Sequence, residues 1–458
     1  MAAGGDTSRH GMWSSRWLFI LAAAGSAVGL GNIWKFPYIA GENGGGAFVL
    51  IYLACVFLVG VPIMMGEVML GRASRQSPIN AMRKAVSISN RNPIWVLLGW
   101  GGAAAGFLIL SYYSVIAGWA LYYIVRLASG EFTGAGADAA TGAFNDLMAS
   151  PGLMLGLHTL FMILTVYIVG RGVAGLETAV RWLMPLLLVL LLVLLGYGYQ
   201  SGGFDEALAF MFRPDWEAAL QTDVVLVAMG QAFFTLSLGM GAIMAYGAYV
   251  PSTASITSTI ATIALLDTFV AVTSGLAIFP IVFANGLEPS AGPGLMFITV
   301  PLAFGQLPGG AIFGAAFFLL VTFAAVTSAI SLTEPVLAYL VEEYNAKRQR
   351  VAISVGVITW FLGIGSVLSF NWWSGYQLFG LNFFELVDYF TQNIMLPLGG
   401  LAIGIFTAWL WNRDTLWAQL GWPEGAVRIL WYLLAGFLAP LAVVIVFVVT
   451  LFPGLLGA

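Results

Sequence analysis

Charged residues, cysteine and histidine are scarce in this chain. Asp, Glu, Lys and Arg make up 8% of the 458 residues, whereas a soluble domain carries roughly 25%. The single cysteine, Cys55, excludes an intramolecular disulfide. The two histidines, His10 and His158, are too few and too far apart in the sequence to predict a metal site. Since no pair of nucleophile and base is apparent either, the residues argue against an enzyme.

Long apolar runs fill the sequence instead. Hydrophobic residues make up 60% of the chain, the mean hydropathy is +0.93, and the runs do not alternate as the strands of a membrane β-barrel would. A membrane-spanning helix needs about 20 apolar residues, and the runs predict eleven such helices. We expect them near residues 14–40, 46–71, 94–127, 152–170, 176–199, 225–249, 256–284, 309–341, 351–370, 383–411 and 427–453. The sequence therefore predicts an all-α, multi-pass membrane protein.

The distribution of positive charge predicts the orientation, because Lys and Arg concentrate on the cytoplasmic side of membrane proteins. With a cytoplasmic N-terminus, only Lys35, Arg126 and Arg213 of the 17 Lys and Arg residues fall near the outside. The loops at 128–151 and 200–224, in which Asp and Glu predominate, would then be external. An odd number of spans would place the C-terminus outside. We expect the protein in the cell membrane, inner or plasma.

Glycine interrupts the first and the sixth predicted span at mid-membrane depth. The interruptions are Gly29-Leu30-Gly31 and Ser237-Leu238-Gly239-Met240-Gly241. Each glycine costs a helix about 1 kcal/mol relative to alanine, and freed backbone groups find no water in lipid. Close helix packing is one explanation for such glycines. Breaks at matching positions of two halves are the better pointer to a transporter, whose unwound carbonyls bind cations and whose half-helix N-termini receive carboxylates.

The residues around these breaks resemble one family. Gly25 to Asn32 with Trp34-Lys35-Phe36-Pro37, then Glu42 to Phe48, Gln231 to Gly239 and Thr327-Ser328, are similar to the neurotransmitter:sodium symporters. The resemblance runs from about residue 13 to 411 and more loosely to the end, and it is closest to bacterial amino-acid symporters with eleven spans. It implies alternating access and co-transport with Na⁺.

The resemblance also implies the fold. This is the LeuT-like fold, the inverted-repeat architecture of the bacterial leucine transporter, with helices 1 and 6 unwound at mid-membrane. We expect one transmembrane transport domain over residues 1–458. Its first five-helix repeat would cover 14–199, the second inverted repeat 225–411, and the eleventh helix 427–453.

By resemblance, the substrate site lies at the two breaks. The N–H groups of Leu30 and Gly31 and the hydroxyl of Tyr113 would bind a carboxylate. Gly29 stands where monoamine carriers have an aspartate, which implies that the substrate brings its own carboxylate and is an α-amino acid. The implied substrate residues are Ser26, Ala27, Gly29, Leu30, Gly31, Ile109, Tyr113, Phe234, Thr235, Ser237, Met240, Ser328, Ala329 and Leu332.

Met240 indicates a broad side-chain pocket. Many relatives carry phenylalanine at this position, and methionine is flexible enough to fill or vacate space. We expect the pocket to accept aliphatic and aromatic side chains, tryptophan included. The alternative is that Met240 simply packs in the core.

Two sodium sites follow from the resemblance. The first would use Ala27, Asn32, Thr235 and Asp267 together with the substrate carboxylate. The second would use Gly25, Val28, Ala324, Thr327 and Ser328. Both sets offer only oxygen ligands, which hard cations prefer. The alternative for Thr327 and Ser328 is that their hydroxyls bond back to their own helix.

Asp267 stands where most family members have an asparagine, and a carboxylate inside the membrane is expected to be functional. The family's chloride site would use Tyr52, Gln231 and a serine at position 271, but this chain has Ala271. We therefore expect two Na⁺ ions and no chloride. Asp267 would be ionised with sodium bound and protonated on the return step, which would give proton counter-transport.

The resemblance further implies gates on both sides of the site. Lys35 and Asp388 would form the outer pair. The inner gate would use Trp13, Tyr249 and Glu342, with a basic partner that aligns on His10 while Arg9 lies one place away. The alternative is that these charges at helix ends are simply solvated.

The fifth span carries a Gly-X9-Pro spacing from Gly175 to Pro185. Proline removes one hydrogen bond from a helix. In the family this spacing marks the place where the helix unwinds and admits cytoplasmic water to the second sodium site.

The sequence thus predicts sodium-coupled symport of neutral hydrophobic L-amino acids such as leucine and tryptophan. One alternative is a carrier of another small zwitterion, although a quaternary ammonium would favour an aromatic cage. A solute-gated channel or sensor is another, although no soluble output domain is apparent. The expected partners are the amino acid and the lipid bilayer, without nucleic acid, in a monomer or homodimer.

Overall fold

The computed structural model describes residues 11–219, 221–288 and 294–451. Within these residues, nine helices are long and apolar enough to cross a membrane, or ten if one bent pair is counted as a single span. The long spans comprise α3 with α4 (Gly46–Cys55 and Val61–Ser74), α6 (Leu97–Ala128), α8 (Pro151–Val169), α9 (Gly172–Gln200), α14 (Ile256–Ala284), α16 (Gly310–Tyr344), α17 (Arg348–Ser369), α18 with α19 (Phe383–Tyr389 and Leu396–Ile405) and α21 with α22 (Ala426–Leu433 and Ala439–Leu451).

The first predicted span is the bent pair. Helix α1 (Arg16–Ala27) is preceded by Ser15, whose side chain accepts a hydrogen bond from the N–H of Leu18. The residue after the helix, Val28, has an extended backbone with a ψ of 90°. A short π-helical turn then leads into α2 (Phe36–Glu42), and the two parts meet at 60°. The predicted break of the first helix is confirmed.

The sixth predicted span is broken as well. Helix α12 (Thr222–Thr235) and α13 (Ala242–Gly247) are each too short to cross a membrane alone. Between them Ser237, Gly239 and Gly241 have φ values of +54°, +76° and +72°. Glycine adopts these left-handed values readily, so the glycines turn the chain here without the penalty that a side chain brings.

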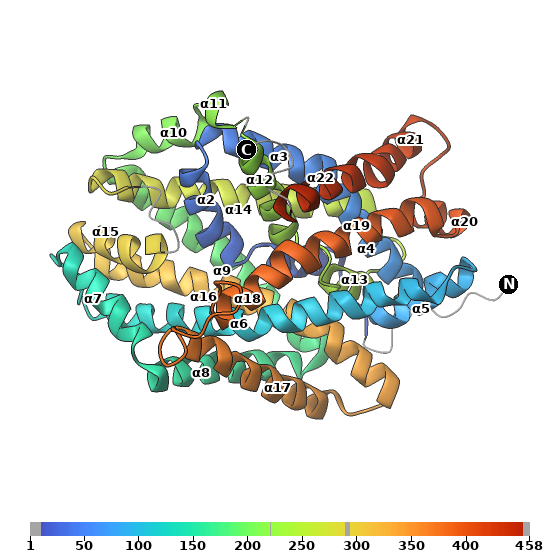
Figure 1. Cartoon of the computed structure of the whole chain (residues 1–458), viewed down its shortest axis with the longest axis horizontal. Coiled ribbons are helices and arrows are strands. Elements are labelled where there is room, and N and C mark those ends of the chain that lie inside the picture. The colour runs from blue at the N-terminus through green and yellow to red at the C-terminus, as the bar shows by residue number, and fades with distance from the viewer. Residues whose placement is uncertain (1–10, 220, 289–293, 452–458) are drawn as a thin grey trace.

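Helices α6 and α16 cross the centre of the molecule and pack along each other, and α1 lies against α9, α14 and α16. A Cβ atom at Gly106 would lie only 3.1 Å from the carbonyl oxygen of Leu332. Glycine at this position therefore lets α6 approach the middle of α16. On one flank α8 packs against α17, and both also contact α6 (Figure 1).

Short helices cover the two ends of the bundle. Figure 1 places α7 (Ala137–Met148), α10 (Phe204–Phe212) and α15 (Val300–Gln306) toward one end. It places α5 (Pro78–Ile88) and α20 (Arg413–Leu420) at the other, while α11 (Trp216–Ala219) packs against α3. The loops with predominantly acidic charge thus lie together, away from the basic connections of α5 and α20.

Candidate functional site

A small cavity lies where the break in α1 faces α6, α12 and α16. Its volume is about 20 Å³, barely the room that one water molecule needs. The lining residues come from both breaks and the two central helices. They are Ser26, Ala27, Gly29, Leu30, Gly31, Ile109, Tyr113, Phe234, Ser237, Met240, Ser328, Ser331 and Leu332.

Most of the predicted substrate residues are therefore brought together. Among the described residues that line the cavity, Thr235 and Ala329 do not appear, so their contact with substrate stays a prediction. Ser331 lines the cavity and was missed. It lies three residues after Ser328, and helix positions three apart share a face, so the periodicity of α16 held the signal.

One wall of the cavity offers hydrogen-bond donors. The N–H of Leu30 lies 3.3 Å from the hydroxyl oxygen of Tyr113, and both groups belong to buried residues. This N–H stands just beyond the end of α1, where the helical bonding pattern is interrupted. A backbone N–H and a phenol hydroxyl that converge in an apolar cavity can bind a carboxylate.

The two glycines of the first break are sterically required. A Cβ atom at Gly29 would lie 2.5 Å from Oγ of Ser328 and 3.2 Å from the hydroxyl of Tyr113. A Cβ atom at Gly31 would lie 2.8 Å from two ring carbons of Phe234. Side chains at these positions would push into the cavity or displace the ring of Phe234, the lid of the cavity, so an aspartate at position 29 is excluded without rearrangement.

Serines form the floor of the cavity. Oγ of Ser26 donates to Oγ of Ser331 at 2.7 Å and lies 3.2 Å from Oγ of Ser237. The Ser237 hydroxyl in turn donates to the carbonyl oxygen of Ser26 at 2.9 Å. These bonds join α1, the break after α12, and α16 at one point.

Asp267 lies beside the cavity at the centre of an oxygen-rich cluster. Its Oδ1 accepts hydrogen bonds from Nδ2 of Asn32 at 2.8 Å and from Oγ1 of Thr235 at 3.0 Å. The hydroxyl of Tyr52 lies 3.5 Å from Oδ2, and the side chain of Asp267 is fully buried. A buried carboxylate is costly without a partner charge, so this cluster suits a cation.

Asn32 and Thr235, both predicted for the first sodium site, thus hydrogen-bond to a third predicted ligand, Asp267, and Ala27 lines the adjoining cavity. Oδ1 of Asn32 also accepts the N–H of Gly29 at 3.2 Å, which ties the cluster to the first break. In the part of the chain that the structure describes, no three His, Cys, Asp or Glu residues cluster. The donors suit a hard cation, which takes oxygen ligands.

Two residues of the family's chloride site are present in this chain, and one of them, Tyr52, lies beside the same carboxylate. Nε2 of Gln231 donates to the carbonyl oxygen of Gly31 at 3.0 Å, while its Oε1 has no hydrogen-bond partner among the described residues. Ala271 is buried one turn after Asp267 and has no hydroxyl to offer. Asp267 therefore places a carboxyl group beside Tyr52.

The second predicted sodium site lies where α1 meets α16. Oγ of Ser328 is 3.4 Å from the carbonyl oxygen of Gly25, and a Cβ atom at Gly25 would lie 3.1 Å from Cβ of Thr327. The hydroxyl of Thr327 bonds to the carbonyl oxygen of Ala324, in its own helix, at 3.0 Å. The backbone of Val28 is extended at the end of α1. Hydroxyl and carbonyl groups of α1 and α16 therefore meet here, although the hydroxyl of Thr327 also hydrogen-bonds within its own helix.

A vestibule of about 360 Å³ leads from the cavity to the end of the bundle that carries α7 and α15. Tyr113 and Phe234 lie at its base, and Lys35 and Asp388 line it further out. The ammonium of Lys35 donates to Oε1 of Gln392, and Nε2 of Gln392 donates to Oδ1 of Asp388. Gln392, one helical turn after Asp388, therefore bridges the predicted outer pair and was missed.

The N-terminal segment packs against α13 and the turn that follows it. Trp13 is 2% exposed, its backbone N–H donates to the carbonyl oxygen of Tyr249 at 3.1 Å, and its Nε1 donates to the carbonyl oxygen of Tyr246 at 3.3 Å. The structure thus brings Trp13 and Tyr249 together. Glu342 accepts from the N–H of Ser77 at 2.8 Å. Arg9 and His10, the candidate basic partners, lie outside the described residues.

A buried ion pair next to Tyr249 was not predicted. Arg348 donates to Oε1 of Glu334 at 3.0 Å and to Oε2 at 2.5 Å. The hydroxyl of Tyr249 donates to Oε1 of the same carboxylate at 2.7 Å. Glu334 is fully buried, and this bidentate pair links α16 and α17 to the segment after α13.

Helix α9 is continuous through Gly175 and Pro185. The predicted unwinding is absent from this conformation. It stays a prediction for a conformation that opens inward.

Comparisons with known proteins agree with this geometry. The family model described as the sodium:neurotransmitter symporter family matches residues 10–135 and 147–453 of the sequence. The sodium-dependent transporter YhdH of Bacillus subtilis (strain 168) is 39% identical over 439 residues, covering 95% of this chain and 96% of that protein. The sodium- and chloride-dependent GABA transporter 2 of Homo sapiens is 24% identical over 486 residues, covering 93% of this chain and 78% of that protein.

A solved structure is similar along the whole chain. The crystal structure of MhsT in complex with L-phenylalanine matches with a TM-score of 0.89 and 44% sequence identity, covering 96% of this chain and 99% of that one. The predicted LeuT-like fold is thereby confirmed. The chain belongs to the sodium:neurotransmitter symporter family and is a secondary transporter, not an enzyme.

Proposed function

We propose that this protein couples the entry of Na⁺ to the uptake of neutral hydrophobic L-amino acids, both aliphatic and aromatic. The observation that carries the proposal is the cavity at the first break, where the N–H of Leu30 and the hydroxyl of Tyr113 converge. The similar protein MhsT was solved with L-phenylalanine, which supports an amino acid as substrate here.

Each end of the substrate has a counterpart in the cavity. The carboxylate binds at Leu30, Gly31 and Tyr113, and the ammonium binds carbonyl oxygens near Ala27, Phe234 and Thr235. The rest of the wall, including Ile109, Met240 and Leu332, is apolar and receives an uncharged side chain. Since the cavity now holds about 20 Å³, its walls move outward when an amino acid enters, and the flexible Met240 gives way first.

The oxygen clusters on either side of the cavity hold two Na⁺ ions. Asn32, Thr235 and Asp267 with Ala27 form the first site, and the substrate carboxylate completes it. Gly25, Val28, Ala324, Thr327 and Ser328 form the second, at the contact of α1 with α16.

Transport proceeds without chloride, because the buried carboxylate of Asp267 supplies a negative charge beside Tyr52. On the empty return step Asp267 takes up a proton, which leads to proton counter-transport. Without its cation, an ionised carboxylate in this dry cluster would be strongly disfavoured.

Alternating access opens the site first to one side and then to the other. The N-terminus is cytoplasmic and the C-terminus external, so the vestibule faces outward, with Lys35, Gln392 and Asp388 at the outer gate. Trp13, Tyr249 and Glu342 close the inner side. The protein acts as a monomer or homodimer in the cell membrane.

Uptake of radiolabelled leucine and tryptophan into proteoliposomes tests the proposal. We expect accumulation of both only with an inward Na⁺ gradient, and equally well when gluconate replaces chloride. Met240→Phe should lower tryptophan uptake at least tenfold while leucine uptake persists, because overpacking an apolar pocket is costly. Uptake of either amino acid without Na⁺ would refute sodium coupling, and a chloride requirement would refute the role of Asp267.

A further inference from the structure

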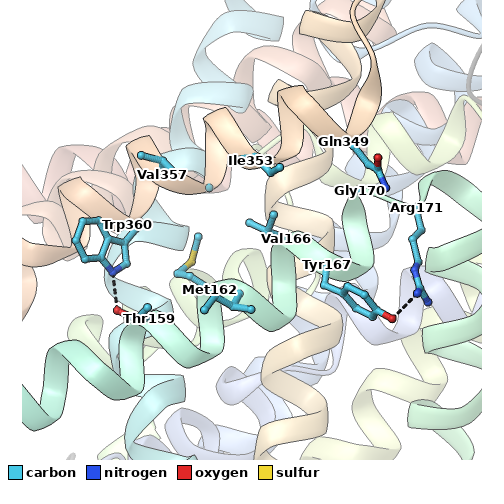
Figure 2. Close-up of a pocket in the computed structure, with 12 residues that line it drawn as sticks. Thr159, Met162, Val166, Tyr167, Gly170, Arg171, Gln349, Ile353, Val357 and Trp360 are labelled. Atoms are coloured by element: carbon cyan, nitrogen blue, oxygen red, sulfur yellow. Dashed lines mark hydrogen bonds between the residues drawn. The ribbon is translucent and has the colours of Figure 1, made fainter.

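A second, larger groove lies on the flank of the molecule, away from the transport pathway. It runs between α8 and α17 with a volume of about 650 Å³. Figure 2 shows Met162 and Val166 on one helix facing Ile353 and Val357 on the other. None of its lining residues belongs to the substrate cavity or the vestibule.

The walls of this groove are apolar and partly open to the surroundings. Ile353 is 56% exposed and Val357 is 58% exposed, although both lie within a membrane-spanning helix. Gly356, between them, has no side chain, and a Cβ atom there would clash with Val166. The missing side chain lets the two helices approach while Ile353 and Val357 stay on the outer side. Within a bilayer, such a surface is covered by hydrocarbon.

The two ends of the groove differ in charge. At one end Nε1 of Trp360 donates to Oγ1 of Thr159 at 2.8 Å, so the polar atoms there satisfy each other. At the other end the guanidinium of Arg171 lies 4.0 Å above the ring centroid of Tyr167 and donates to its hydroxyl (Figure 2). The groove therefore has a neutral, largely apolar end and a cationic mouth.

Among the described residues, the positive charge at the mouth has no carboxylate partner. In the described ranges no ion pair involves Arg171, nor the exposed Lys347 and Arg350 at the start of α17. The buried acid Glu334 is already bound by Arg348. A cationic mouth on a long apolar groove complements an amphiphile with an anionic head and a hydrocarbon tail.

We propose that this groove binds one anionic phospholipid of the cytoplasmic leaflet. Its acyl chain lies along Val166 and Val357, and its phosphate is bound by Arg171. Basic pockets between membrane helices on the cytoplasmic side commonly hold anionic headgroups. The proposed lipid site does not require any particular transported solute. It requires only that this end of the bundle is cytoplasmic, as proposed above.

The headgroup would lie close to the inner gate. A Cβ atom at Gly172, next to Arg171, would be 3.6 Å from Cδ of Arg348. Arg348 forms an ion pair with Glu334, and the carboxylate of Glu334 accepts a hydrogen bond from the hydroxyl of Tyr249. An anionic lipid at Arg171 therefore stabilises the arrangement of α8 and α17 in which this inner ion pair is formed.

Native mass spectrometry of the purified protein tests the proposal, with dioleoyl-phosphatidylglycerol and dioleoyl-phosphatidylcholine titrated separately. We expect one tightly retained phosphatidylglycerol and weaker retention of phosphatidylcholine. Arg171→Gln should weaken phosphatidylglycerol retention about fivefold, the effect of one basic residue near a lipid surface. Arg181→Gln, an exposed arginine on α9 outside the groove, is the matched control and should change nothing.

Gly356→Leu probes the hydrocarbon part, because a side chain there would enter the space of Val166. We expect it to reduce retention of both lipids in this groove, with the melting temperature reported in parallel to verify folding. Equal affinity for the two lipids, or equal behaviour of Arg171→Gln and Arg181→Gln, would overturn the proposal. A change from dimer to monomer in Gly356→Leu with lipid retention unaltered would overturn it in favour of a second copy of the chain.

Discussion

Replacing Asp267 by asparagine removes the negative charge from the cluster with Asn32 and Thr235 while it preserves the size of the side chain. A cation about 4 Å from a carboxylate gains on the order of 4 kcal/mol at an effective dielectric constant near 20. A free energy of this size corresponds to about a thousandfold change in affinity for the cation. Because asparagine keeps one oxygen ligand, we expect the Na⁺ concentration for half-maximal uptake to rise about tenfold to hundredfold.

Thermal unfolding in detergent measures the same effect without transport. A ligand at about 100 times its dissociation constant stabilises the folded state by about 2.7 kcal/mol. If Asp267→Asn weakens binding about a hundredfold, the same Na⁺ concentration contributes only about 0.4 kcal/mol. Without Na⁺ the variant should be about as stable as the wild type, because Asp267 is then protonated and carries no charge for the asparagine to remove.

Thr268→Val is the matched control, because Thr268 is the next residue on α14 and its hydroxyl has no hydrogen-bond partner among the described residues. It should leave the Na⁺ dependence unchanged. We also expect added chloride to restore part of the activity of Asp267→Asn, beside Tyr52 and Gln231. An unchanged Na⁺ requirement together with unchanged chloride independence would refute the assignment of Asp267 to the first sodium site.

Three further changes test the lid and the gates. Gly31→Ala should raise the KM for substrate about tenfold in uptake assays, because its Cβ atom would lie 2.8 Å from the ring of Phe234; an unchanged KM would show that the ring moves freely. Ile116 also lines the vestibule, and Gln392→Ala should raise the labelling rate of an Ile116→Cys reporter about fivefold, the effect of losing one partly exposed charged contact. Glu334→Gln should destabilise the protein by about 3 kcal/mol in thermal unfolding, because it breaks a buried ion pair, and wild-type stability would contradict that pair.

The breaks of the first and sixth spans could be predicted because glycine acts locally. Gly29 and Gly31, and the positive φ values at Gly239 and Gly241, follow from the absence of a side chain, which the sequence shows directly. The cavity around them was also predicted in large part. Its backbone donors and its aromatic lid come from short motifs whose residues stay together in any fold.

The partners that were missed are joined across helices. Gln392 bridges Lys35 and Asp388 only because α18 and the turn before α2 meet at the vestibule. Arg348 reaches Glu334 because the chain reverses between α16 and α17. Such distances depend on how the helices are arranged in three dimensions, and no spacing within one helix specifies them. Glu334 and Glu342 are both candidates for the acidic residue of the proposed inner gate. Both lie on α16, and only their three-dimensional surroundings distinguish them.

The two proposed gates differ in strength, and the difference bears on the transport cycle. The outer gate is a single amide bridge between two half-buried charges, and such contacts contribute up to about 1 kcal/mol each. The inner side combines the buried Trp13 with the bidentate pair of Glu334, whose rupture costs about 3–5 kcal/mol. Without ligands the protein should therefore rest with its inner side closed. Ligand binding must then do more than close the outer gate, because it must also favour the conformation in which Trp13 leaves its site.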